Sequence, residues 1–142
     1  MRKINKIIIH CSATREGEDI SAATIDRWHR DRGWRGIGYH YVVSLNGNIE
    51  YGRPIDESGA HTKNHNKGSI GICYIGGLDE FLDPKDTRTL EQKESLLDLI
   101  KTLKRLNPGA TVHGHNEFAA KACPSFDVAV EYEDVICFFD RQ

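Results

Sequence analysis

The sequence KIIIHC, Lys6–Cys11, is a continuous apolar run rich in β-branched residues that ends in a histidine and a cysteine. Such a run predicts a strand buried on both faces, and a strand of this kind belongs in the middle of a sheet. At roughly 100–200 residues per domain, 142 residues make one domain. We therefore expect a single α/β domain over residues 1–142, with a core at about 4–127 and a tail, 128–142, of unassigned role.

Two segments carry helical patterns. Ser21 is a good N-cap for a helix over residues 22–32, and His29 on this charge-rich helix is expected to face solvent. The sequence TLEQ at residues 89–92 is a capping box, and leucines at helical spacing follow it until Asn-Pro-Gly at 107–109. A short helix is also expected in the tail.

The extended segments follow a different pattern. Residues 38–45 and 48–51 flank Asn46-Gly47, which predicts a hairpin with a two-residue type I′ turn. Residues 69–75 form a further apolar strand, and residues 110–113 form a last short one. Between them, the polar and glycine-bearing segment 53–68 is expected to be a loop that faces the site.

Composition excludes several classes of function. Lys and Arg total 19 against 21 Asp and Glu, a formal net charge of −2, and the pI is near 6.4. This balance provides no basic surface for a phosphate backbone, so we expect no nucleic-acid partner. Apolar runs such as residues 7–9 and 135–136 are far shorter than the roughly 20 residues that span a bilayer, so we expect no membrane span.

The beginning of the chain lacks the pattern of a secretory signal. Its basic residues precede only a short apolar run, and no small-residue cleavage site follows. We therefore expect a cytoplasmic protein unless another factor releases it. In such a chain the four cysteines are more often buried, metal-bound or catalytic than paired, and Cys11 and Cys73 are expected to be small core residues.

Metal-ligating side chains gather at the ends of two predicted strands. His10 ends the first strand, and His113, His115 and Cys123 follow the last. Imidazole and thiolate suit zinc, and a catalytic zinc has three protein ligands and one open position. Because His113 and His115 point to the same side of an extended chain, the spacing allows either to be the second histidine ligand.

Other interpretations of these histidines compete with a zinc site. A single histidine at a strand end is usually a partly buried, hydrogen-bonded residue, and the pair His61 and His65 is expected in a solvated loop. The sequence contains no His-Glu-x-x-His of a metalloprotease. His115-Asn116-Glu117 matches the start of the zinc deaminase motif, but its Pro-Cys-x-x-Cys is missing.

Four motifs follow one another along the chain: HCSAT at residues 10–14, GYHY at 38–41, SIGI at 69–72 before Gly76-Gly77, and KACPSFD at 121–127. In order and spacing, with His115 eight residues before Cys123, they resemble the type 2 N-acetylmuramoyl-L-alanine amidases. That family includes phage lysozymes of the amidase type and shares its fold with the peptidoglycan recognition proteins. The resemblance covers roughly residues 4–127.

The resemblance implies a central mixed β-sheet flanked by helices, with Zn²⁺ in a surface groove. It implies that the metal ligands are His10, His115 and Cys123, which selects His115 over His113. The family's catalytic tyrosine and lysine correspond to Tyr39 and Lys121.

The implied reaction is hydrolysis of the amide between N-acetylmuramic acid and L-alanine in peptidoglycan, which is the expected partner of a monomeric enzyme. Cys123 favours an enzyme, because non-catalytic recognition relatives commonly lack it. The alternatives are a module that binds peptidoglycan without cleaving it and a purely structural zinc. A single domain without a wall-anchoring module is typical of a phage or prophage endolysin that acts on the cell wall after release, with muropeptide recycling or an effector role as other settings.

Overall fold

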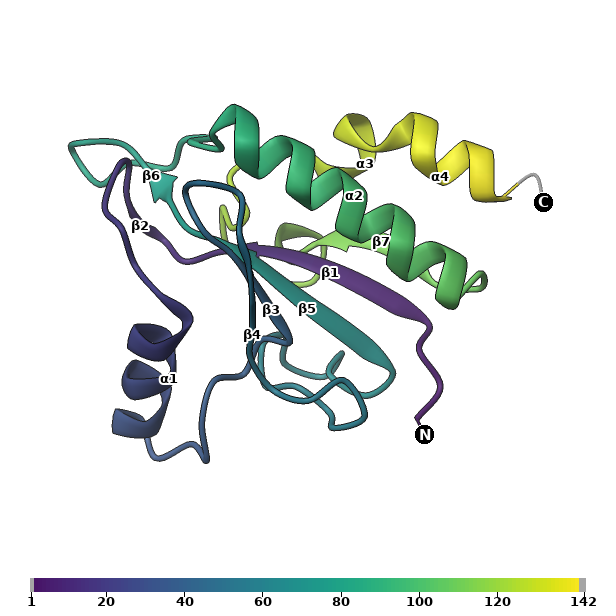
Figure 1. Ribbon diagram of the computed structural model, residues 1–142, viewed down its shortest axis with the longest axis horizontal. Helices are drawn as coiled ribbons and strands as arrows, with labels where there is room; N and C mark the ends of the chain where they lie inside the picture. Colours follow the sequence, from purple (N-terminus) through teal and green to yellow (C-terminus); the bar gives the residue numbers. More distant parts are fainter. Residues whose placement is uncertain (1, 141–142) are drawn as a thin grey trace.

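The computed structural model describes the backbone of residues 2–140 and the side chains of residues 2–136 (Figure 1). Its strands are β1 (Lys6–Cys11), β2 (Thr14–Arg15), β3 (Tyr41–Val43), β4 (Ile49–Tyr51), β5 (Ser69–Tyr74), β6 (Gly77–Leu78) and β7 (Thr111–Gly114). Its helices are α1 (Ala22–Asp31), α2 (Leu90–Leu106), the 3-10 turn η1 (His115–Glu117), α3 (Val128–Glu131) and α4 (Glu133–Asp140).

The main sheet has five strands in the order β4-β3-β5-β1-β7. β1 is parallel to both β5 and β7, β3 is parallel to β5, and only the β3–β4 pair is antiparallel. The sheet is therefore mixed, and the apolar strand that opens the sequence lies inside it, as its pattern predicts. β2 and β6 pair separately as a second, two-stranded sheet.

Helices cover both faces of the main sheet, with α2 on one side and α1 on the other (Figure 1). Leu96 and Ile100 of α2 pack in one cluster with Ile7 and Ile9 of β1. Ile25 of α1 packs in a second cluster that includes residues from the opposite face of the sheet. Because side chains alternate along a strand, His10 points to the face opposite Ile7 and Ile9, the face that α1 covers.

The capping box predicted at the start of α2 is present. Thr89 Oγ1 accepts a hydrogen bond from the Gln92 backbone N–H over 3.0 Å, and Gln92 Oε1 accepts one from the Thr89 N–H over 2.9 Å. The Thr89 hydroxyl also donates to the Leu45 carbonyl over 2.7 Å, so the same residue attaches the helix to the hairpin.

The hairpin forms where predicted, but the predicted turn type is wrong. Ser44 N–H donates to the Asn48 carbonyl, and Gly47 N–H donates to the Ser44 carbonyl, so three residues form the loop. Only Gly47 has a positive φ, +87°, whereas a type I′ turn also requires one at Asn46. The arrangement is a turn followed by a left-handed glycine, which is a common form of three-residue hairpin loop.

The tail folds into α3 and α4 and packs onto the main core. Val128, Tyr132 and Val135 are buried in the cluster that contains β1 and α2. Arg88, whose side chain is 1 % exposed, donates to the Tyr132 hydroxyl over 3.0 Å and pairs with Glu131 over 3.3 Å. The side chain of Cys137, for which no role was predicted, lies outside the described residues.

In the described part of the chain, none of the helices has the length and apolar character needed to cross a bilayer.

Candidate active site

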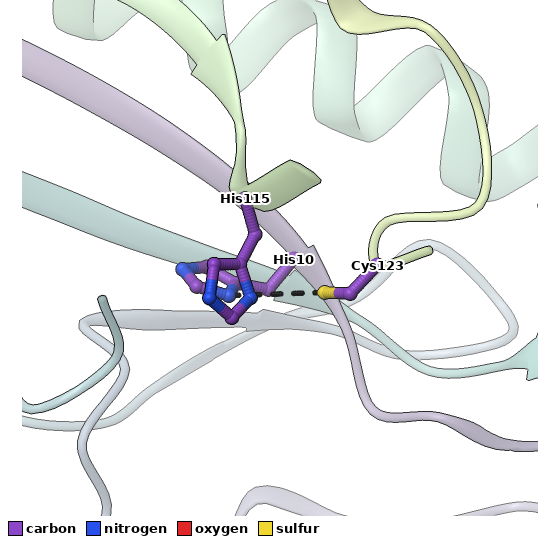
Figure 2. Close-up of side chains that lie close together, drawn as sticks. All are labelled: His10, His115 and Cys123. Atoms are coloured by element: carbon purple, nitrogen blue, oxygen red, sulfur yellow. Dashed lines mark hydrogen bonds between the residues drawn. The ribbon is translucent and has the colours of Figure 1, made fainter. Parts of the chain in front are cut away.

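Three side chains from distant parts of the sequence point toward one another at one edge of the sheet (Figure 2). His10 lies near the end of β1, His115 directly follows β7, and Cys123 comes from the loop after η1. Because β1 and β7 are parallel neighbours, their carboxyl ends meet at the same edge. One ligand atom from each of the three residues lies within 4.8 Å of the others.

The donor set fits zinc. His10 Nδ1 lies 3.8 Å from Cys123 Sγ. In a tetrahedral site with Zn–N near 2.0–2.1 Å and Zn–S near 2.3 Å, nitrogen and sulfur are about 3.6 Å apart. Two imidazoles and one thiolate leave a fourth position open, which is the arrangement of a catalytic zinc site.

Both histidines of this cluster favour the neutral form that binds metal. His10 is 1 % exposed, and burial, followed by the neighbouring His61, His115 and Lys121, holds its pKa well below the usual range. Burial and the charge of Lys121 also lower the pKa of His115.

Cys123 is held by the strand beside it. The Cys11 backbone N–H donates to Cys123 Sγ over 3.2 Å. A hydrogen bond with the Cys11 thiol and burial raise the pKa of Cys123, so a bound cation has to displace its proton. Cys11 and Cys73 are buried, as expected for small core residues.

Tyr39 packs beside the cluster. Its ring centroid lies 5.1 Å from that of His10. Burial, with the nearby thiols of Cys73, Cys123 and Cys11, raises the Tyr39 pKa well above its ordinary value. The hydroxyl therefore stays protonated at neutral pH, although Tyr39 is not among the residues that line the adjoining cavity.

A cavity of about 570 Å³ adjoins the cluster. Its lining includes His115, Lys121, Trp34, His61, Lys63 and Phe118, whereas His10 and Cys123 are not among the lining residues. Lys121 thus lines the cavity together with His115, and its charge lowers the pKa values of both imidazoles.

The expectation that His61 lies in a solvated loop is wrong in part, because His61 is half-buried and lines the cavity. The loop 53–68 faces the site, and His61 Nδ1 lies 2.9 Å from His10 Nε2. Burial, chiefly, lowers the pKa of His61 to about 3. His65 does not join this contact; its ring stacks on Phe118 with centroids 4.2 Å apart.

The expectation for His29 is also wrong. Its exposed fraction is 6 %. Its Nδ1 accepts a hydrogen bond over 2.9 Å from the backbone N–H of Gly38, the residue directly before Tyr39. The sequence contained a signal for this burial, because His29 lies four residues after the buried Ile25 and so on the same helix face. For His61 no local pattern exists, since its contact with His10 depends on the docking of the loop.

His113 points away from the cluster. Its Nδ1 contacts Glu117 Oε1 over 2.8 Å, and its Nε2 contacts Thr111 Oγ1 over 2.6 Å. Asn116 donates to the Phe126 carbonyl. Among the described hydrogen bonds, neither Asn116 nor Glu117 contacts the side chain of His10 or His115.

Comparison with known proteins agrees with this geometry. The family model described as N-acetylmuramoyl-L-alanine amidase matches residues 1–126. The chain is 38 % identical over 127 residues to an endolysin of Klebsiella phage KP32, covering 89 % of this chain and 84 % of the endolysin. It superposes on the N-acetylmuramoyl-L-alanine amidase LysC from Clostridium intestinale with a TM-score of 0.81 and 26 % identity, covering 94 % and 86 %. Bumblebee PGRP-SA superposes with a TM-score of 0.78 and 27 % identity, covering 94 % and 83 %.

A mixed sheet with helices on both faces, and a His-His-Cys cluster that could hold a metal ion, place the chain among amidase-like α/β domains. The chain belongs to the N-acetylmuramoyl-L-alanine amidase family.

Proposed function

We propose that the protein is a zinc-dependent N-acetylmuramoyl-L-alanine amidase that cleaves the amide between N-acetylmuramic acid and L-alanine in peptidoglycan. The observation that carries the proposal is the convergence of His10, His115 and Cys123 beside a cavity, in a chain of the amidase family. These three residues would hold the ion, placing it in the groove that the cavity forms.

Lys121 is the residue suited to stabilise negative charge during the reaction. A bound zinc would lower the pKa of a water ligand and polarise the scissile carbonyl. As the amide carbon becomes tetrahedral, charge develops on the former carbonyl oxygen, and a cation fixed nearby is most effective against that charge. Lys121 lines the cavity and already affects both imidazoles, so its ammonium is close to where the charge develops.

Tyr39 would act as a donor. Its hydroxyl stays protonated because burial raises its pKa, and its ring packs beside His10. It can therefore donate a hydrogen bond to the same oxygen or orient the attacking water. His29 accepts a hydrogen bond from the backbone N–H of Gly38, the residue before Tyr39, and this contact holds the segment against the site.

The setting we propose is that of an endolysin acting on the bacterial cell wall. Support comes from the phage endolysin relative, because the similarity to this chain covers 84 % of the endolysin's length. The likeness to a peptidoglycan recognition protein makes binding without cleavage the second candidate. Cys123 favours cleavage, because it completes the three-ligand set that a catalytic zinc requires.

Metal analysis and a cleavage assay together test the proposal. The purified chain should contain stoichiometric zinc and release peptides with new L-alanine amino termini from purified peptidoglycan, and chelation should abolish the release. Binding to peptidoglycan without new amino termini would identify a recognition module instead. Cleavage that persists after the metal has been removed would overturn the zinc-dependent mechanism.

A further inference from the structure

His61 is the residue outside the proposed ligand set that has the closest polar contact with it. Its Nδ1 lies 2.9 Å from His10 Nε2, whereas the other nitrogen of His10, Nδ1, faces Cys123 Sγ. We infer that His61 is a positioning residue, which accepts a hydrogen bond from His10 Nε2–H and thereby directs His10 Nδ1 to the metal. This inference rests on the proposed zinc site.

The direction of the hydrogen bond follows from the chemistry of imidazole. A neutral histidine that binds metal through Nδ1 carries its proton on Nε2, and this proton needs an acceptor when the ring is buried. If His61 Nδ1 is that acceptor, the His61 proton is on Nε2. Ser69 Oγ lies 3.3 Å from His61 Nε2, and it donates in turn to the Asn66 carbonyl over 3.1 Å. Every donor in this series has an acceptor.

The ring of His61 has little freedom to turn away. A Cβ placed on Gly71 would lie 2.5 Å from His61 Cδ2, and one placed on Gly59 would lie 2.6 Å from the same atom. Because neither glycine carries a side chain, the two positions leave room for the His61 ring. Asn66 Oδ1 accepts hydrogen bonds from the His61 and Thr62 backbone N–H groups, each over 2.9 Å, which holds the loop in place.

Thr62 is the competing acceptor. Its Oγ1 lies 3.2 Å from His10 Nε2 and 2.9 Å from His61 Nδ1. The structure favours His61, because its contact with His10 is the shorter one and its ring is fixed by the two glycines. Separate substitutions of the two residues distinguish them.

A matched pair of variants of the full chain tests the role. In His61→Asn, Oδ1 of the new side chain can take the place of His61 Nδ1 as acceptor. In His61→Leu, the new side chain has nearly the same shape as that of asparagine but offers no acceptor. Zinc affinity is measured by competition with a chelator, and the geometry of the site by the absorption spectrum of the Co²⁺-loaded chain. We expect His61→Leu to bind zinc about 10–100-fold more weakly, as losing an outer partner does. We expect His61→Asn and Thr62→Val to stay within a few-fold of the wild type.

The wild-type chain provides an independent measurement that requires no variant to fold. Long-range ¹H–¹⁵N correlation spectra of the imidazoles in the zinc-loaded protein should show the Nε2–H tautomer for both His10 and His61. A His61 proton on Nδ1 would overturn the inference.

Other outcomes are equally decisive. Unchanged zinc affinity and Co²⁺ spectrum in His61→Leu would overturn the positioning role while leaving the zinc site intact. A larger loss in Thr62→Val than in His61→Leu would assign the acceptor to Thr62, and equal losses in both His61 variants would show that ring packing is what matters. A wild-type chain that binds no zinc would overturn the proposed function and this inference together.

Discussion

The backbone N–H of Cys11 donates a hydrogen bond to Cys123 Sγ over 3.2 Å, although 112 positions separate the two residues. Cys11 is the last residue of β1, so the donor comes from a strand that is buried from Ile7 to Cys11. A backbone donor of this kind fixes the sulfur and stabilises a thiolate. The contact thus joins the loop of the candidate site to the strand that carries His10.

His113 in β7 and His115 directly after it should differ sharply when replaced. His115→Ala removes a proposed ligand. Loss of an outer partner weakens metal binding by up to about 100-fold, and we expect the loss of zinc affinity in His115→Ala to be larger than that. His113→Ala should keep its zinc, since His113 contacts Glu117 and Thr111 instead. Chelator competition on the two variants measures the difference. Equal losses would show that the ligand set is wrong.

Lys121→Met should lower kcat by about 10²–10³-fold, the usual effect of removing a group that stabilises the developing oxyanion. Zinc content should stay that of the wild type, because Lys121 is not a proposed ligand. The matched control is Lys67→Met, an exposed lysine of the 53–68 loop that is absent from the cavity lining. If Lys121→Met were as active as the control, the charge of Lys121 would have no catalytic role.

His40 should make the protein less stable in mild acid. Its Nδ1 accepts a hydrogen bond from the Gly71 N–H over 3.0 Å, and burial lowers its pKa to about 4. Between the unfolded pKa near 6.5 and the folded value, only the unfolded chain takes up the proton, so stability falls as pH falls. From pH 7 to pH 5 this residue should remove about 2 kcal/mol from the free energy of unfolding.

Urea denaturation of the chelator-treated protein at the two pH values measures this effect. His10, His61 and His115 also have lowered pKa values, so the share of His40 is the difference between the wild type and His40→Asn, which keeps an acceptor near the position of Nδ1. The variant should show a shallower pH dependence. Identical slopes would contradict the assignment.

Arg88 attaches the tail to the core. Its guanidinium lies 3.6 Å from the centre of the Phe126 ring, 2.8 Å from Asp86 Oδ2 and 3.3 Å from Glu131 Oε1. Both carboxylates are partly exposed, so the energy of these ion pairs should lie between that of surface pairs and that of buried pairs. We therefore expect Arg88→Met to lower the free energy of unfolding by about 2 kcal/mol. Arg105→Met, at an exposed position of α2, should stay within about 0.5 kcal/mol. A similar value for both variants would show that Arg88 does not stabilise the tail.

Much of the architecture was predictable because its causes are local. The apolar run of β1 and the capping box of α2 depend on neighbouring residues, and both form where predicted. The hairpin was predictable for the same reason, but its turn was not. Leu45 accepts a hydrogen bond from Thr89, and a Cβ on Gly47 would lie 2.8 Å from the Glu91 carbonyl oxygen, so contacts with α2 influence the loop.

The candidate site was also predictable from the sequence only in part. The residue types identified His10, Cys123 and either His113 or His115, and the resemblance selected His115 and added Tyr39 and Lys121 before any geometry was available. His29 and His61 were assigned to solvent, yet both are held against the site by contacts from other elements. A histidine in a polar segment has no local signal for burial when its partner lies tens of residues away.

The order of the amino acids therefore specifies the strands, the capped helices and the types of side chain that converge on the candidate metal site, because these depend on periodicity and on motif spacing. Only tertiary packing selects which nitrogen of His10 faces Cys123, and only packing turns His61 toward His10 and His113 away from the cluster. The physical reason is that a hydrogen bond to an imidazole depends on the placement of both partners, and here β1 and the 53–68 loop come together only when the sheet assembles.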